Sequence, residues 1–108
     1  MEKDIIWHGD SLESVKTFPL RIRRAVGTEL RRLQQGLEPM NWKPMKSIGP
    51  GVREVRVNID GAFRVIYVTA RPDRIHVLHA FRKKTQRTAV ADIRLARQRL
   101  GLIRRRAH

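Results

Sequence analysis

The chain has 108 residues, of which 41% are hydrophobic, which suffices for one folded domain with a modest core and argues against disorder. Its 24 Lys and Arg against 10 Asp and Glu give a formal net charge of +14, so nucleic acid is the first partner to expect and an acidic protein the second. The absence of cysteine excludes disulfides, thiolate chemistry and zinc–sulfur sites. No signal peptide and no apolar run that could span a bilayer is recognisable, so we expect a cytoplasmic protein without a membrane partner.

The first third of the sequence predicts a short strand and two helices. Residues 4–7 (DIIW) are typical of a strand, and Asp10 with Glu13 forms a capping-box pattern for a helix that ends near Phe18. Pro19 suits the first turn of a longer second helix, which Gly36 would stop. The second helix carries one apolar stripe, formed by Ile22, Val26, Leu30, Leu33 and Leu37.

Residues 38–51 contain three prolines and two glycines, so we expect a long loop without regular structure. This loop carries Trp42 beside Lys43, with Lys46 three residues further on. Trp42 could stack on a nucleic-acid base. The more common role of such a tryptophan is to anchor the loop to the core, because large aromatic side chains are usually mostly buried.

The second half predicts three antiparallel strands and a last helix. Residues 53–59 (REVRVNI) and 62–68 (AFRVIYV) alternate in polarity around the hairpin turn at Asp60 and Gly61. A further turn at 71–73 precedes a third strand that ends near Phe81, and the last helix follows Thr85 or Thr88 and ends near Gly101.

These elements predict an α+β fold with an N-terminal strand, a two-helix hairpin, a three-stranded antiparallel meander and a C-terminal helix. We expect a single domain over residues 1–101, followed by a basic C-terminal tail over 102–108.

Strand alternation places several charged side chains on one face of the meander. Glu54 and Arg56 share a face of the first strand, and Arg64 projects from the second. The two helices should cover the opposite, more apolar face and leave the charged face open. Guanidinium groups on an open sheet suit phosphate binding, although solvated side chains or a pair between Glu54 and one arginine would give the same pattern. The basic run Arg82 to Lys84 ends the third strand at the same edge.

Three segments of the chain, in their order and spacing, resemble the RelE/ParE superfamily of toxins, and most of all its phage-related, HigB-like branch. These segments are GPGVREVRVNIDGAFRVIYV, LHAFRKKTQRT and ADIRLARQRL. The resemblance covers nearly the whole chain. It implies a type II toxin–antitoxin pair whose toxin is held inactive by a cognate antitoxin, often a helix-turn-helix protein of the HigA-like kind. It also implies that the toxin enters the ribosome and inhibits translation as an endoribonuclease, an mRNA interferase. In that reaction the 2′-hydroxyl attacks the neighbouring phosphate without a metal or another cofactor.

The resemblance also implies roles for individual residues. Arg56 would orient the RNA backbone, and Arg64 would stabilise negative charge on the phosphate that is cleaved. Lys84 would assist the leaving oxygen, or Lys83 would do so if the match to the family is shifted by one residue. We expect the neighbouring cations to contribute to RNA binding; these are Arg53, Arg82, Lys46 and Lys43.

The general base is unassigned, because the final helix lacks a tyrosine and Tyr67 is expected to be buried. Glu54 and His79 are weak candidates. A lysine with a lowered pKa could also move the proton. No metal site is expected, because His76 and His79 are three residues apart on a strand and should point to opposite faces unless a bulge intervenes.

Two other functions fit the same charge. One is a ParE-like inhibitor of DNA gyrase that cuts nothing, and the other is a non-catalytic nucleic-acid-binding module. The alignment of cations on one face favours the nuclease, because an inhibitor needs no such convergence.

Overall fold

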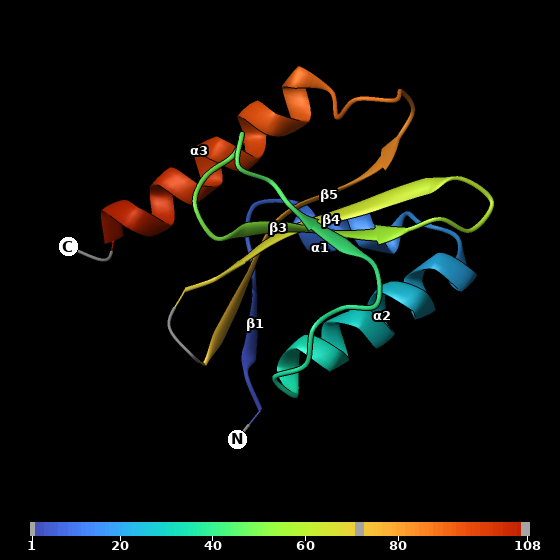
Figure 1. The fold of residues 1–108 in the computed structure, drawn as a ribbon, viewed down its shortest axis with the longest axis horizontal. Helices are drawn as coiled ribbons and strands as arrows, with labels where there is room; N and C mark the ends of the chain where they lie inside the picture. The colour runs from blue at the N-terminus through green and yellow to red at the C-terminus, as the bar shows by residue number, and fades with distance from the viewer. Residues whose placement is uncertain (1, 71–72, 107–108) are drawn as a thin grey trace.

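The fold is seen in a computed structural model that describes residues 2–70 and 73–106. The described part begins with β1 (Asp4–Trp7), α1 (Ser11–Lys16) and α2 (Leu20–Gln34). Four strands follow, β2 (Trp42–Pro44), β3 (Val52–Val57), β4 (Ala62–Thr69) and β5 (Arg74–Lys83), and the last element is α3 (Val90–Arg106) (Figure 1). The turn expected at 71–73 lies largely outside the described residues, as does the end of the expected tail.

All five strands belong to one sheet, in the order β1-β5-β4-β3-β2. β1 runs parallel to β5, and the other neighbours are antiparallel. The expected fold, a two-helix hairpin with a three-stranded antiparallel meander, is therefore wrong. The N-terminal strand joins the sheet through a long-range parallel pairing, and the loop over 38–51 supplies a fifth strand, β2, which local sequence patterns did not reveal.

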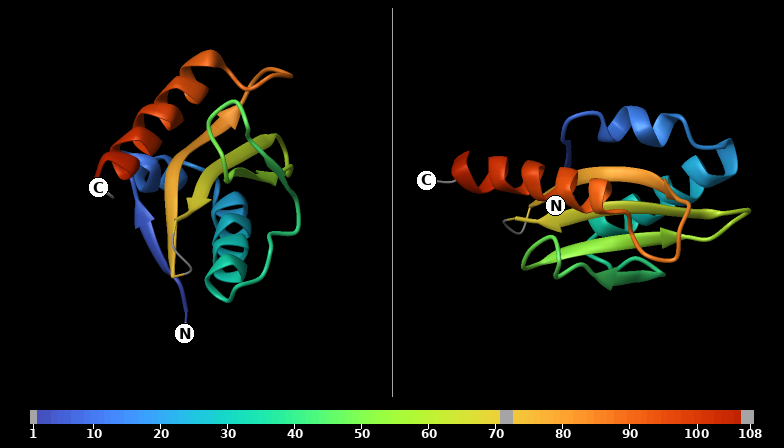
Figure 2. Two further views of the ribbon diagram at one scale, coloured as in Figure 1. Left: turned by 60° about the vertical axis from the view of Figure 1, so that its left-hand side comes forward. Right: turned by 90° about the horizontal axis from the view of Figure 1, so that it is seen from above.

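Helices cover both faces of the sheet (Figure 2). On one face, residues of α1 and α2 pack against inward residues of β3, β4 and β5 in a first core, which includes Phe18, Ile22, Val26, Leu30, Val55, Phe63, Val65, Tyr67 and Val77. On the other face, α3 and the loop before β3 form a second core of Met45, Ile48, Val52, Ile66, Val68, Leu78, Phe81, Ala96 and Leu100. The expected open face is thus partly covered.

Several local expectations also fail. The Asp10–Glu13 capping box does not form, because the Asp10 carboxylate accepts a hydrogen bond from Nη2 of Arg99 at 2.6 Å instead of capping α1. Leu37 lies past the end of α2 and is 48% exposed, because the chain turns at Gly36, where φ is +81°. The last helix continues to Arg106 instead of ending near Gly101.

A β-bulge shifts the pairing of β4 with β5. Ile66 lies opposite His79, and Tyr67 lies opposite Val77, so β5 contains one extra residue at this point. His76 and His79 then face the same side of the sheet, contrary to the expectation from simple alternation.

No helix in the described ranges is long and apolar enough to cross a membrane.

Candidate functional site

Four neighbouring strands each place one cation on the sheet face that also carries α3. Lys43 of β2 pairs with Glu54 of β3, and Arg56 of β3 lies directly opposite Arg64 of β4. Lys83 of β5 pairs with Ala62, two residues before Arg64, so it shares that face. Neighbouring strands lie about 4.8 Å apart, so these side chains form a line across the sheet, which we call the cation row: Lys43, Arg56, Arg64 and Lys83.

A buried ion pair lies at the centre of the cation row. Glu54 is fully buried, and its Oε1 is 3.3 Å from Nε of Arg64, which is only 3% exposed. Nη1 of Arg64 donates hydrogen bonds to Oδ1 of Asn58 at 2.8 Å and to the Phe63 carbonyl at 2.9 Å. Burial lowers the pKa of Arg64, and the Glu54 carboxylate opposes that shift, so the guanidinium stays charged. Nη1 of Arg64 is therefore held by protein groups, whereas its Nε, like the two carboxylate oxygens of Glu54, is buried without a hydrogen-bond partner among the described residues.

Arg56, Lys43 and Lys83 are better placed to meet a ligand, because each is half-buried and not enclosed. Nε of Arg56 is shielded from solvent and has no hydrogen-bond partner among the described residues. Burial lowers the pKa of Lys83, and the positive charges of Arg64, Lys43 and Arg56 lower it further, against the opposing effect of Glu54. Cations assembled at this density favour an anion between them.

Other cations predicted to bind RNA lie elsewhere. Arg53 pairs with Tyr67 on the opposite sheet face, where its Cζ lies 4.1 Å from the centre of the Trp42 ring and its Nη1 lies 3.3 Å from Oε1 of Glu38. Trp42 is half-buried and takes this arginine as its stacking partner. Arg82 lies over the Phe63 ring, with Cζ 5.6 Å from its centre, on the side of the first core.

The two remaining predicted cations are exposed at the margins. Lys46 lies in the loop between β2 and β3, beside a pocket that Trp42 and Arg53 also line. Lys84 follows the last residue of β5 and is exposed. Of the pair Lys83 and Lys84, it is therefore Lys83 that lies in the cation row.

The two histidines of β5 have structural partners. Nε2 of His79 lies 2.7 Å from Oδ1 of Asp92, which ties β5 to α3, and its ring stacks on Phe81. Nδ1 of His76 lies 2.8 Å from Nε2 of His8. Within residues 2–70 and 73–106, no three His, Asp or Glu side chains gather as they would around a metal ion. Neither Glu54, which is enclosed, nor His79, whose Nε2 contacts Asp92 and whose Nδ1 is shielded from solvent, is favoured as a general base.

Sequence reasoning placed Lys43 on an irregular loop and gave Asn58 no role. Lys43 reaches the cation row only because Trp42–Pro44 pairs with β3, and a strand of three residues is too short to show a period. The alternation that puts Glu54 and Arg56 on one face also puts Asn58 there, and its amide oxygen is the signal in the sequence that could have indicated a partner for Arg64.

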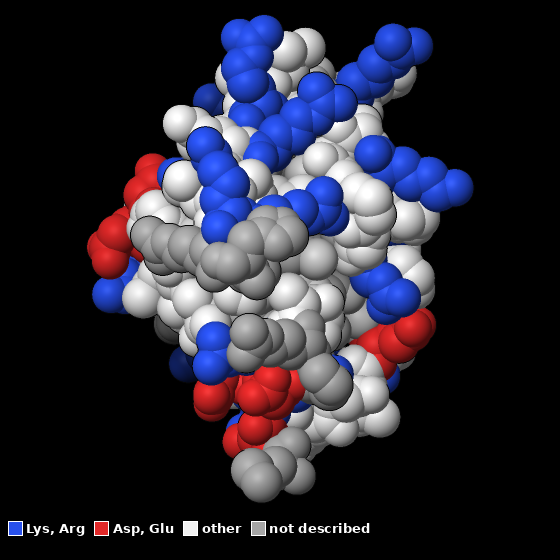
Figure 3. Space-filling model, turned by 90° about the vertical axis from the view of Figure 1, so that its left-hand side faces the viewer, with Lys and Arg blue, Asp and Glu red and all other residues white. Residues whose placement is uncertain are grey.

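Basic side chains also gather on the outer surface of α3, where Arg94, Arg97, Arg104 and Arg105 are exposed. In Figure 3, Lys and Arg spread over the upper part of the molecule, and acidic side chains lie at its left edge and in its lower half. The positive field is therefore strongest on the α3 side.

Residues 13–101 match the family model of phage-derived Gp49-like proteins (DUF891). A comparison with curated proteins gave no match. Because the family model spans most of the chain and includes the whole cation row, the chain belongs to the Gp49-like family of phage-derived proteins, a RelE/ParE-like toxin family of toxin–antitoxin systems.

Proposed function

We propose that this protein is the toxin of a type II toxin–antitoxin pair, in the HigB-like branch, and that it cleaves mRNA on the ribosome. The observation that carries the proposal is the cation row, in which three half-buried cations surround a buried Glu54–Arg64 pair on one sheet face. Membership of the Gp49-like family supports the toxin role.

The chemistry follows from what such cations do to a phosphodiester. The 2′-oxygen forms a bond to phosphorus, the bond from phosphorus to the 5′-oxygen breaks, and the products are a 2′,3′-cyclic phosphate and a 5′-hydroxyl. Negative charge builds on the non-bridging oxygens, where the Arg56 guanidinium would bind, and fixed donors aimed there lower the barrier. Lys83 would give its proton to the departing 5′-oxygen, a step that a lowered pKa favours. The proton of the 2′-hydroxyl goes to a base that remains unassigned.

In this proposal Arg64 and Glu54 are positioning residues. They form a buried ion pair in the middle of the sheet face, and Arg64 lies directly opposite Arg56 in the ladder. The positive charge of Arg64 also helps to lower the pKa of Lys83. Contact between Arg64 and the RNA is not required.

The partners follow from the same proposal. The net charge of +14 suits binding to ribosomal RNA and mRNA in the cytoplasm, and an acidic antitoxin, of the helix-turn-helix, HigA-like kind, would bind when the toxin is inactive.

The test is primer extension on an mRNA translated by purified ribosomes. We expect cuts that require ribosomes with the wild type, and a cleavage rate that falls about a hundredfold or more with Arg56→Ala. Arg23→Ala, an exposed arginine on α2, is the matched control and should cleave as the wild type does. Arg64→Ala is a poorer probe, because it leaves Glu54 buried without its partner, at a cost of about 3–5 kcal/mol in stability.

Uncut mRNA would contradict the nuclease. If expression of the protein still arrested growth, a ParE-like inhibitor of gyrase would be the better interpretation. If the cells grew normally, a non-catalytic nucleic-acid-binding module would replace both toxin functions.

A further inference from the structure

We propose that the pocket beside Lys46, at the free edge of the sheet, holds one unpaired nucleotide, whose base stacks on the Trp42–Arg53 pair and whose phosphate is bound by Lys46. The inference rests on the proposed function, since it takes RNA as the ligand and adds a contact outside the cation row.

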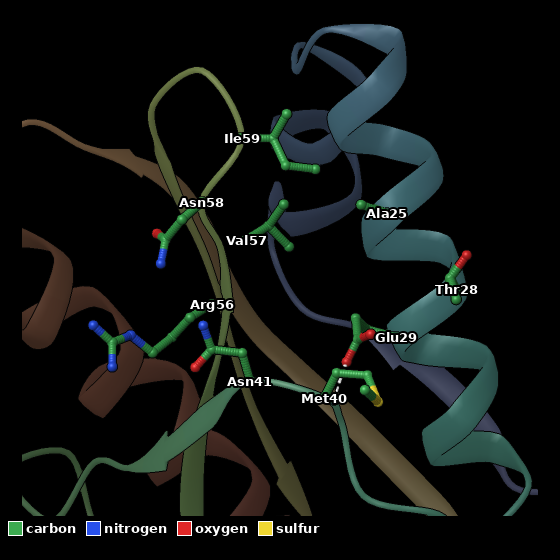
Figure 4. A pocket seen from close by; sticks show the side chains of 9 residues that line it. All are labelled: Ala25, Thr28, Glu29, Met40, Asn41, Arg56, Val57, Asn58 and Ile59. Carbon is green, nitrogen blue, oxygen red and sulfur yellow. Dashed lines mark hydrogen bonds between the residues drawn. The ribbon is translucent and has the colours of Figure 1, made fainter.

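The pocket lies where β2 forms the edge of the sheet, and its volume is about 530 Å³, within the usual range for small-molecule sites. Trp42 pairs with Val55, and Pro44 pairs with Arg53, so these side chains lie on the face of the first core. Figure 4 shows Arg56 of the cation row on the other side of β3, away from α2. The pocket is therefore distinct from the cation row. Its lining comes from both strands and the turn between them: Trp42, Pro44, Lys46, Pro50, Gly51 and Arg53.

Trp42 and Arg53 form a stacking surface in this pocket. Cζ of Arg53 lies 4.1 Å from the centre of the Trp42 ring, and Nη1 of Arg53 lies 3.3 Å from Oε1 of Glu38. The carboxylate thus helps to fix the guanidinium over the ring. Nucleobases stack both on aromatic rings and on guanidinium planes. Pro44 adds an apolar wall, so the pocket suits a flat aromatic ligand.

Lys46 supplies the positive charge that is available to a ligand of this pocket. Its side chain is exposed and makes no ion pair within the described part of the chain. The turn that carries it is fixed on both sides, because Met45 is buried in the second core and the Ser47 carbonyl accepts a hydrogen bond from Nε of Arg97 at 2.6 Å. A cation on a fixed turn beside a stacking surface matches a nucleotide, which joins a base to a phosphate.

The backbone of β2 offers little to the alternative ligand, an extended acidic peptide. The Asn41 carbonyl accepts a hydrogen bond from the Arg56 amide at 2.9 Å, so alternation turns the backbone groups of Trp42 and Pro44 away from β3. Pro44 has no N–H, and this edge therefore presents the Trp42 amide as its single backbone donor. A peptide that adds to a sheet edge depends on such main-chain bonds. A nucleotide does not, and the net charge of +14 favours it.

The first measurement uses Trp42 as a fluorescent reporter. The chain has two tryptophans, so Trp7→Phe leaves Trp42 as the single one. This variant is titrated with an oligo(U) of eight nucleotides with 2′-O-methyl riboses, which cannot undergo 2′-oxygen attack. We expect saturable quenching of Trp42 fluorescence, because the base stacks beside the ring.

The second measurement keeps Trp7, which packs against the first core, and follows the anisotropy of the same oligomer carrying a fluorescein label. Trp42→Ala should weaken binding about fivefold or more. Lys46→Ala should lower the slope of log affinity against log salt concentration by about 0.7, because one phosphate contact is lost. Lys16→Ala removes the same charge from an exposed position on α1 and is the matched control, which should keep the wild-type slope.

The nucleotide has two possible sources, the strand bound by the cation row or a separate RNA strand. A 2′-O-methyl dinucleotide is too short to reach both sites, so it is compared with the longer oligomer in the Trp7→Phe background. If one strand occupies both sites, Arg56→Ala should weaken quenching by the longer oligomer and leave quenching by the dinucleotide unchanged. If the strands are separate, Arg56→Ala should change neither.

Absence of Trp42 quenching by the oligomer, or equal salt slopes for Lys46→Ala and Lys16→Ala, would overturn the inference. Failure of the proposed function is a separate result, because it appears as uncut mRNA on ribosomes even where Trp42 is quenched.

Discussion

At the scale of single residues, burial separates cations that the sequence presents as equivalent. Arg56 and Arg64 alternate onto the same face, as expected, but Arg64 is enclosed with Glu54 while Arg56 stays half-buried. Strand periodicity determines the face of a side chain and cannot determine how deeply neighbouring elements cover it. The sequence left open whether an arginine pairs with Glu54. In the structure this arginine is Arg64, whose Nη1 is also bound to Asn58 and to the Phe63 carbonyl.

The pKa of Lys83 is the property of a single residue that most directly reflects the cation row. We expect it to lie below the ordinary lysine value, because burial and the charges of Arg64, Lys43 and Arg56 disfavour the ammonium form. The measurement is a ¹³C NMR titration of the lysine side chains, with Lys43→Ala as the comparison. Removal of one cation should raise the pKa of Lys83.

Because the pKa of Lys83 is lowered in the folded protein, its contribution to stability depends on pH. Between the lowered pKa and the ordinary one, the unfolded chain binds more protons than the folded protein, so the contribution of Lys83 to stability rises with pH across that window. An ordinary pKa for Lys83 in the folded protein, or no response to Lys43→Ala, would show that the cations do not interact.

At the scale of elements, the sequence predicts those with a strong local period. The stripe on α2 is confirmed from Ile22 to Leu33, and so is the alternation in β3 and β4, because each of these elements buries one face against the first core. β2 was missed, since three residues ending in Pro44 give no period and gain their structure from pairing with β3. The bulge in β5 was missed for a similar reason, because it depends on the register with β4.

The loop before β3 is predicted to depend on close packing against α3. A Cβ on Gly49 would lie 2.5 Å from Cδ2 of Leu100, which is buried in the second core. Gly49→Ala should therefore lower the free energy of unfolding by about 1–3 kcal/mol, measured by urea denaturation.

Gly27→Ala is the matched control for that substitution. Gly27 lies on the exposed side of α2, where an added Cβ would meet no neighbouring group of the described residues within 4 Å. Alanine there should raise the free energy of unfolding by about 0.5–1 kcal/mol. Equal effects of the two substitutions would show that the loop is not packed against α3 as described.

At the scale of the whole molecule, charge and family could be predicted from the sequence, whereas the composition of the site could be predicted only in part. The net charge of +14 and the order of the segments pointed to the RelE/ParE toxins, and the family match supports that level. Which cations converge depends on the five-stranded sheet. β2 brings Lys43 to the cation row, while alternation directs Arg53 and Arg82 to the opposite face.

The most direct test of the central claim compares Lys83→Ala with Lys84→Ala in ribosome-dependent cleavage, because the two lysines are adjacent in sequence and only Lys83 lies in the cation row. We predict that Lys83→Ala lowers the cleavage rate by about a hundredfold or more, whereas Lys84→Ala has a much smaller effect through RNA binding alone. Equal losses in the two variants, or a larger loss with Lys84→Ala, would contradict a catalytic role for the cation row.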